Sequence, residues 1–112
     1  MRKFSTVILL LTFTIIACEK SDVAENTPNC IVNKIETLKK NSICDDPNIK
    51  EYNFQGIVVY VVDQGSCGAD LSAGVFDSDC NGLGELGGII GNTIINGEEF
   101  SNATFIRLIW RK

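Results

Sequence analysis

The sequence predicts an α+β domain in which one N-terminal helix packs on a small antiparallel sheet of about four strands, stapled by two disulfides. Three observations predict this class. An apolar stripe with helical spacing comes first, strand-like segments follow it, and an even set of cysteines lies beyond position 18. A helix followed by a run of strands is typical of α+β folds, whereas α/β folds alternate the two.

The helix is predicted over residues 29–40. Ile31, Ile35 and Leu38 recur at the spacing that places side chains on one face of a helix. Asn29 is expected to be the N-cap residue, and two lysines near the end suit the negative end of the helix dipole.

A β-hairpin is predicted next. Lys50–Phe54 and Ile57–Val62 flank Gln55-Gly56, which is typical of a tight turn between antiparallel strands. The second strand is apolar at every position, so both of its faces should be buried. We therefore expect it to be a central strand with a covering layer on each side.

The rest of the chain predicts fewer strands. Residues 63–88 are rich in glycine and are expected to be mostly turns, with one short strand near Leu71–Phe76. The alternation near the C-terminus predicts a strand with Ile106, Leu108 and Trp110 on one face, and the tryptophan is expected in the core.

Residues 81–103 are predicted to form a folded cover over the second face of the central strand, with a short strand near Thr93–Ile95. Other unassigned stretches carry too few apolar residues, whereas this one has Leu83, Leu86, Ile89, Ile90, Ile94, Ile95 and Phe100. We expect the rim of this cover to be the recognition surface. A purely structural role for the segment is the alternative.

The first 18 residues resemble the signal of a bacterial lipoprotein. Arg2 and Lys3 precede an apolar run of about thirteen residues, which is too short to span a bilayer core of roughly 30 Å. The run closes on Ile15-Ile16-Ala17-Cys18, which resembles a lipobox, the motif in which the cysteine thiol receives a diacylglycerol. We therefore predict that residues 1–17 are a signal peptide and that Cys18 is the lipid attachment site. An ordinary signal peptide with an incidental Cys18 is the alternative.

Residues 18–29 are predicted to be the lipidated cysteine and a flexible tether, and residues 30–112 the α+β domain. Glu19-Lys20-Ser21-Asp22 is similar to the short acidic export signals of Bacteroidota lipoproteins. The expected location is the cell envelope, with a lipid anchor in the outer membrane. Both the cell surface and the periplasmic face stay open.

With Cys18 reserved for lipid, four cysteines remain: Cys30, Cys44, Cys67 and Cys80. An even number in an oxidising compartment predicts two disulfides. A turn at Gln55-Gly56 places opposite each other residues whose numbers sum to 111, as those of Cys44 and Cys67 do. We therefore favour Cys44–Cys67 with Cys30–Cys80, and a Cys67–Cys80 bridge is the rival.

Composition argues against several functions. From Cys18 onward the chain has 8 Lys and Arg against 14 Asp and Glu, a net charge of −6, which disfavours nucleic acid and anionic lipid headgroups as partners. The chain has no histidine, so histidine-activated nucleophiles and the commonest general base are missing. We expect no enzymatic activity, no cofactor and no metal centre.

Two short segments resemble known motifs. Asp77-Ser78-Asp79-Cys80-Asn81-Gly82 resembles the start of a calcium loop with Glu85 in its ninth position, but Gly88 stands where a bidentate acid is required. An Asp/Asn turn is preferred, and calcium binding by Asp77, Asp79, Asn81 and Glu85 stays open. Gly82-Leu83-Gly84-Glu85-Leu86-Gly87 matches a dinucleotide motif by coincidence, because no βαβ unit surrounds it.

The domain is similar to a family of small Bacteroidota lipoproteins of unknown function. The similar segments are Gly56-Ile57-Val58-Val59-Tyr60, Gly65-Ser66-Cys67-Gly68-Ala69-Asp70, Phe76-Asp77-Ser78-Asp79-Cys80 and Leu86-Gly87-Gly88-Ile89-Ile90-Gly91-Asn92-Thr93. The resemblance covers roughly residues 30–112. Relatives often have Cys-Cys at Ser66-Cys67 and another cysteine near Glu98, which implies that those two positions pair in the relatives and leaves four cysteines to pair here.

Together these features predict a membrane-anchored lipoprotein whose domain is a non-catalytic binding or inhibitor-like module for an unknown protein or small ligand. The alternative is a structural accessory subunit of an envelope complex. A binding module predicts a concave, partly apolar site, and an accessory subunit predicts a flat apolar patch.

Overall fold

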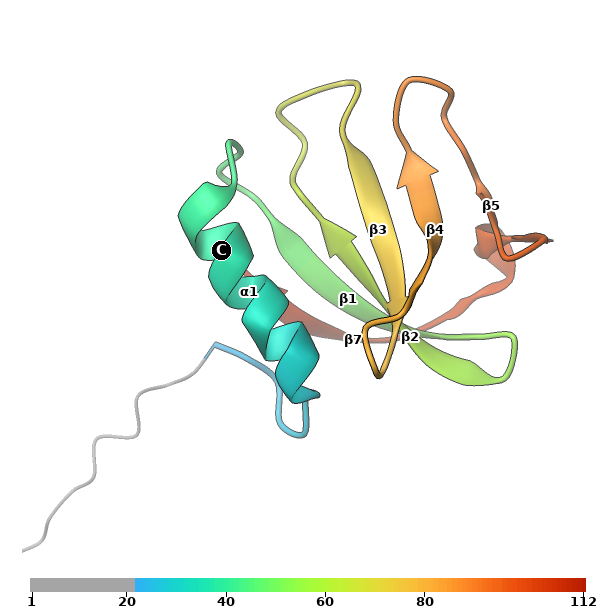
Figure 1. The fold of residues 1–112 in the computed structure, drawn as a ribbon, viewed down its shortest axis with the longest axis horizontal. Coiled ribbons are helices and arrows are strands. Elements are labelled where there is room, and N and C mark those ends of the chain that lie inside the picture. The colour runs from blue at the N-terminus through green and yellow to red at the C-terminus, as the bar shows by residue number, and fades with distance from the viewer. Residues whose placement is uncertain (1–21) are drawn as a thin grey trace, which may run out of the picture.

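The computed structural model describes residues 22–112 (Figure 1). One helix, α1 (Asn29–Asn41), precedes a five-stranded antiparallel sheet with strand order β4-β3-β2-β1-β7, and a two-stranded ribbon pairs β5 with β6. The strands are β1 (Asn48–Phe54), β2 (Ile57–Asp63), β3 (Ser72–Asp77), β4 (Gly82–Gly87), β5 (Ile94–Ile95), β6 (Glu98–Glu99) and β7 (Thr104–Arg111), with a 3₁₀ turn η1 (Phe100–Asn102). The α+β class is as predicted, but the main sheet has five strands rather than about four.

The helix buries the predicted stripe. Ile31, Ile35 and Leu38 are all buried, and the chain leaves the helix at Ser42. The predicted cap is wrong, because Asn29 lies inside the first turn and Pro28 occupies the N-cap position. The Pro28 carbonyl accepts hydrogen bonds from the backbone amides of Ile31 and Val32, both at 3.0 Å. No helix within residues 22–112 is both long enough and apolar enough to cross a bilayer.

The predicted hairpin is confirmed with its register. Asn48 pairs with Asp63 and Phe54 with Ile57, so partner numbers sum to 111 throughout. Gln55 and Gly56 have φ values of 53° and 78°, as a two-residue turn that follows the twist of the strands requires. β2 is the middle strand of the five, as its uniformly apolar sequence predicted.

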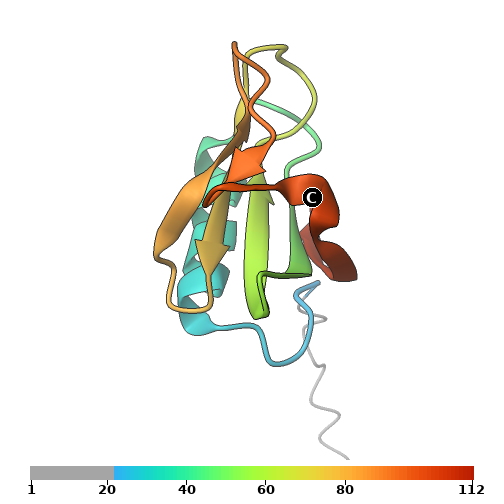
Figure 2. The ribbon, with the colours of Figure 1, turned by 90° about the vertical axis from the view of Figure 1, so that its right-hand side faces the viewer.

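Two apolar clusters cover the two faces of the sheet. The α1 stripe packs with Ile49, Tyr60 and Trp110 on one face. On the other face, Ile95 packs with a second group of sheet residues, Phe54, Val59, Val61 and Val75. Figure 2 shows α1 and η1 on opposite sides of the sheet. The second layer that β2 requires is therefore present.

This second layer follows from the topology. β4 and β7 are the two edges of the sheet, so the chain must cross the width of the sheet between them. It crosses on the face opposite α1, and Ile95 and Phe100 from this crossing pack on the second cluster. The predicted strand near Thr93–Ile95 is confirmed as β5.

The first part of the predicted cover is a strand of the sheet instead. β4 lies within the glycine-rich stretch that we expected to be turns, and it pairs with β3. Glycine is disfavoured in strands, so β4 was not predicted as a strand. Gly84 has φ +150°, and a side chain there would begin 3.0 Å from Ile95 Cδ1. The glycine therefore lets the second layer approach β4.

The alternation predicted for the last strand is only partly correct. Trp110 is buried as expected, but Ile109 beside it is also buried, whereas Ile106 and Leu108 are 45% and 38% exposed. Two register irregularities between β1 and β7 cause this. A bulge adds a residue to one strand, which shifts the following side chains to the other face.

The N-terminal segment is more ordered than a flexible tether. In its described part, residues 22–28, the backbone amide of Ala24 donates to the Ile109 carbonyl at 2.9 Å, and Val23 and Ala24 pack on the first cluster. The Thr27 hydroxyl donates to the Ala24 carbonyl. The ordered domain therefore begins near Val23 rather than at residue 30, because the side chains of Val23 and Ala24 pack on the first cluster.

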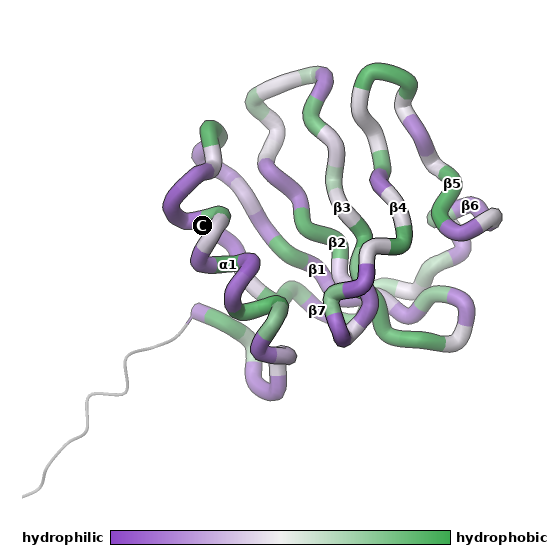
Figure 3. The backbone as a smooth tube through the Cα atoms, viewed as in Figure 1, coloured by the Kyte–Doolittle hydropathy of each residue, from purple (hydrophilic) through white to green (hydrophobic). Residues whose placement is uncertain are grey.

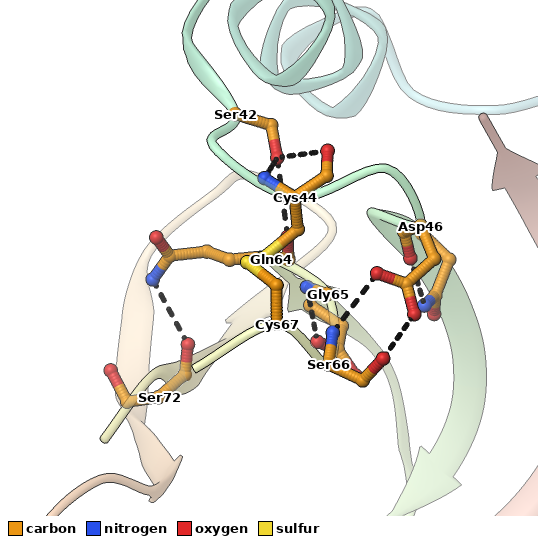
Figure 4. The surroundings of a disulfide bond; sticks show 10 residues. Ser42, Cys44, Asp46, Gln64, Gly65, Ser66, Cys67 and Ser72 are labelled. Carbon is orange, nitrogen blue, oxygen red and sulfur yellow. Dashed lines mark hydrogen bonds between the residues drawn. A yellow bond between two sulfur atoms is a disulfide. The ribbon is translucent and has the colours of Figure 1, made fainter. Parts of the chain in front are cut away.

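The two disulfides fasten both ends of α1 to the sheet. Cys30, in the first turn of the helix, bonds to Cys80 in the β3–β4 turn, and Cys44, just after the helix, bonds to Cys67 in the β2–β3 connection. Both pairings are the favoured ones, and the hairpin register accounts for Cys44–Cys67. Around the second bridge (Figure 4), a side chain at Gly65 would meet Cys44 Cβ at 2.5 Å, so the bridge requires glycine there.

One buried carboxylate lies on the helix-covered face. Glu51 accepts hydrogen bonds from the Tyr60 hydroxyl at 2.8 Å and from Arg107 Nε at 2.7 Å. Glu51 is 6% exposed and Tyr60 3% exposed. Burial, followed by the hydrogen bond to Glu51, raises the pKa of Tyr60 to about 12.

The raised pKa predicts a loss of stability in alkali. Below pH 10 the Tyr60 hydroxyl keeps its proton in both the folded and the unfolded chain, so its contribution is constant. Between pH 10 and about 12 the unfolded chain releases the proton and the folded chain keeps it, so the free energy of unfolding should fall by up to about 3 kcal/mol. Tyr60→Phe should remove this dependence and cost about 1–3 kcal/mol at neutral pH, because Glu51 loses a donor.

Urea unfolding at pH 8 to 12 measures the fall in the free energy of unfolding. The absorbance of tyrosinate shows whether tyrosine ionisation accompanies it. The second tyrosine, Tyr52, also has a raised pKa because it is partly buried, so the difference between wild type and Tyr60→Phe isolates Tyr60. A Tyr60 that titrates near pH 10 would contradict the buried cluster.

A matched pair of substitutions tests the second layer. Ile95 is fully buried and Ile89 is 85% exposed, although both lie in the predicted cover. Ile95→Asp should lower the free energy of unfolding by several kcal/mol or prevent folding, because it buries an unpaired carboxylate. Ile89→Asp should leave the melting temperature within a few degrees of wild type. Equal melting of the two variants, measured by circular dichroism, would show that the second layer is wrongly placed.

Candidate functional site

Three connections gather at one end of the sheet, and we call them the loop end. They are residues 42–47 between α1 and β1, residues 64–71 between β2 and β3, and residues 88–93 between β4 and β5. Figures 1 and 2 both show them on the same side of the molecule. In Figure 3 the tips of the first and third connections are strongly hydrophobic.

The third connection is a hydrogen-bonded hairpin tip. Gly87 and Asn92 bond to each other through both of their backbone groups, at 2.8 and 3.0 Å. The Asn92 side-chain amide donates to the carbonyls of Glu85 and Ile94 at 2.7 and 2.8 Å. The tip is therefore fixed by hydrogen bonds to both flanking strands, β4 and β5.

This tip displays two isoleucines to solvent. Ile89 and Ile90 are 85% and 86% exposed, and Ile43 in the first connection is 78% exposed. Our prediction placed Ile89 and Ile90 among the buried residues of the cover, and this is wrong. They occupy the turn itself, where the chain reverses beyond the reach of the sheet.

A hollow of about 420 Å³ lies beside the tip. Its walls come from the β2–β3 side and from the hairpin: Asp70, Ser72, Glu85, Gly87, Gly88, Ile89, Ile90 and Asn92. The Ser72 hydroxyl donates to Glu85 Oε1 at 2.8 Å, which orients that carboxylate. Two carboxylates next to aliphatic side chains suit a cationic group on an apolar stem, such as a lysine or arginine side chain.

The charge around the hollow has one sign. The sequence has no lysine or arginine between positions 51 and 106, and this stretch has eight acidic residues, Glu51, Asp63, Asp70, Asp77, Asp79, Glu85, Glu98 and Glu99. The stretch forms β2 to β6 together with the second and third connections of the loop end. This half of the domain therefore has a negative field.

Two aspartates serve the local loops. Asp77 accepts hydrogen bonds from the backbone of Asp79 and from the backbone and side chain of Asn81, and these bonds, led by that of the Asn81 side chain, lower the pKa of Asp77. The bonds from Ser66, first that of its hydroxyl, likewise lower the pKa of Asp46. Both carboxylates are thus engaged in shaping turns.

The calcium-like loop does not form a cluster of ligands. Asp77 faces its own turn, and Glu85 is bonded to Ser72 across the β3–β4 pair. Within residues 22–112 no group of three or more acidic or cysteine side chains is placed to hold a metal ion.

The other predicted positions lie elsewhere. Cys18 lies outside the described residues, and the four bridge cysteines hold the helix rather than line the hollow. Sequence reasoning missed Asp70, Ser72 and Asn92 as wall residues. The pairing of β3 with β4 places Ser72 opposite Gly87, and only recognition of β4 as a strand would have revealed this.

One family model matches residues 33–112, which is more than half of the chain. The match spans most of α1, every strand and the loop end. No curated protein and no solved structure matches the chain significantly. The chain belongs to the family described as "Domain of unknown function (DUF6970)".

Proposed function

We propose that this protein is a lipid-anchored, non-catalytic binding module of the cell envelope that recognises a protein partner through its loop end. The observation that carries the proposal is the pair of isoleucines, Ile89 and Ile90, exposed on a hydrogen-bonded hairpin tip. Contiguous apolar surface that is exposed on a monomeric domain is typical of a binding site.

The tip can supply substantial binding energy. Complete burial of an isoleucine side chain contributes about 1.5–3 kcal/mol, so the pair could contribute several. The tip is already held by the bonds of Gly87 and Asn92, which reduces the entropy lost on binding. These features support a small, preorganised contact that dominates recognition.

The charges indicate the chemistry of the partner. Asp70 and Glu85 line the hollow next to the two isoleucines, in a half of the chain without lysine or arginine. A complementary surface has an apolar socket for the isoleucines and a lysine or arginine for the hollow. We therefore propose a partner protein with a basic rim around an apolar pocket.

The sequence near the N-terminus supports the anchor. The basic start, the short apolar run and Ala17-Cys18 together favour diacylglycerol attachment at Cys18. A diacylated and N-acylated cysteine would hold the protein firmly on a membrane, because several chains bind far more tightly than one.

Cys18→Ser should abolish lipid attachment. We expect the variant to incorporate no labelled palmitate and to appear in the soluble or unprocessed fraction, whereas wild type incorporates the label and sediments with membranes. Cys67→Ser is the control, since it removes a bridge cysteine and should keep the label. Undiminished label in Cys18→Ser would disprove the anchor.

Ile89→Ser combined with Ile90→Ser should remove partner capture. The full-length protein, crosslinked in native envelopes, should lose at least about tenfold of its captured partner in this variant, because two anchor side chains are lost. Asp70→Asn with Glu85→Gln should weaken capture less and reduce its dependence on salt. Ile57→Ser is the matched control, since Ile57 is also exposed but lies at the opposite end of β2.

Capture that is equal in the tip variant and in wild type would contradict the proposed recognition surface. Stable co-purification with a membrane complex in both would favour the structural accessory role instead. Loss of capture in Ile57→Ser alone would place the interface at the β1–β2 turn.

A further inference from the structure

The chain enters the domain along the outer edge of β7. β7 is an edge strand of the sheet, and the Ala24 amide bonds to the Ile109 carbonyl on its free side. Figure 2 shows the first described residues beside this strand. A lipid anchor that precedes residue 22 is therefore attached on the β7 side of the domain.

The distance between that side and the proposed lipid is short. Only five residues separate Cys18 from Ala24, and six fully extended steps reach roughly 20 Å at most. The ordered packing of Val23 and Ala24 removes the longer tether that the sequence suggested. With a diacylglycerol on Cys18, β7 must lie close to the bilayer surface.

β7 presents apolar side chains on this side. Phe105 is 54% exposed, Ile106 45% and Leu108 38%. Tyr52 on β1 packs edge to face against Phe105, with ring centroids 5.6 Å apart. Aromatic rings with polar tips next to aliphatic side chains are typical of surfaces that sit at the headgroup level of a membrane.

Three basic side chains lie on or beside β7, and the entering segment adds the acidic Asp22 and Glu25. Lys50 lies opposite Leu108 in the β1–β7 register. Arg111 is the last residue of β7, and Lys112 follows it. Among the described residues, the ion pairs are Lys39 with Glu36 and Arg107 with Glu51, so Lys50, Arg111 and Lys112 are available to lipid phosphates. The overall charge of −6 disfavoured such contacts, but positions 51–106 carry eight acidic and no basic residues, whereas the rest of the chain from Cys18 carries eight basic and six acidic residues.

We propose that the exposed side of β7 rests on the phospholipid bilayer, with Phe105, Ile106 and Leu108 at the headgroup level and Lys50, Arg111 and Lys112 facing lipid phosphates. This proposal rests on the lipid anchor at Cys18. Because the anchor already holds the domain at the surface, even a weak apolar contact suffices to orient it.

The orientation has a consequence for recognition. β4, which carries the Ile89 and Ile90 tip, is the opposite edge of the sheet from β7. Four strand spacings of about 4.8 Å separate the two edges. With β7 on the membrane, the tip belongs to the edge of the sheet that is farther from the bilayer.

Fluorescence quenching by brominated lipid tests the orientation. The mature lipidated protein is placed in phosphatidylcholine vesicles with bromine on the acyl chains, and tryptophan is introduced as Phe105→Trp or, as the matched control, Ile89→Trp. The native Trp110 is 3% exposed and provides a constant background. We expect Phe105→Trp to be quenched at least about twofold more than Ile89→Trp, and Leu108→Trp should behave like Phe105→Trp if the first variant folds poorly.

Vesicle flotation separates the two proposals. Protein that floats with vesicles but shows equal quenching at positions 105, 108 and 89 overturns the orientation and leaves the anchor intact. Stronger quenching at position 89 would show that the tip itself enters the bilayer. Protein that does not float overturns the anchor and the orientation with it.

Discussion

The fold depends on one strand that is apolar on both faces. β2 is the central strand of the sheet, and burial of both faces requires two layers. α1 supplies one, through Ile31 and Ile35. The other is supplied by the crossing from β4 to β7, through Ile95 and Phe100. The crossing serves two purposes, because it joins opposite edges of the sheet and excludes water from the second face. The exposed tip is the turn at which this crossing begins.

The disulfides add stability that so small a core does not supply. A chain of this length buries a limited area, and α1 is held to the sheet by few large side chains. Cys30–Cys80 fixes its first turn and Cys44–Cys67 the loop after its last turn. Cross-links of this kind remove conformational freedom from the unfolded chain and commonly contribute about 2–4 kcal/mol each. They also set the loop end, because the second bridge ties residues 42–47 to the β2–β3 connection on which the hollow depends.

Local patterns predicted local structure well and long-range consequences poorly. The α1 stripe and the Gln55-Gly56 turn are encoded by neighbours in the sequence, so both were correct, and the turn register also brought Cys44 and Cys67 together. β4 was missed because its glycines weaken every strand signal, while their use is to admit Ile95 from a different layer. The contact of Glu51 with Arg107 joins positions 56 apart, and bulges in β7 exposed side chains that simple alternation would bury. The hollow could not be predicted for the same reason, since its walls come from the β2–β3 connection, β3, β4 and the hairpin tip.

Net charge was the least informative quantity, because it averages over a segregated distribution. Every charged residue between positions 51 and 106 is acidic, whereas lysine and arginine occur on both sides of that stretch together with the other six acidic residues. The fold preserves part of this division, since β1 and β7 are neighbours and bring Lys50 and Arg111 to one side of the sheet. The opposite edge, β4, carries Glu85 and leads into the tip with the exposed isoleucines. A domain divided in this way has two surfaces of different chemistry on one rigid sheet, and the segment that ends at Ala24 joins the cationic one. An anchor attached there leaves the acidic, apolar-tipped surface as the one free to meet a partner.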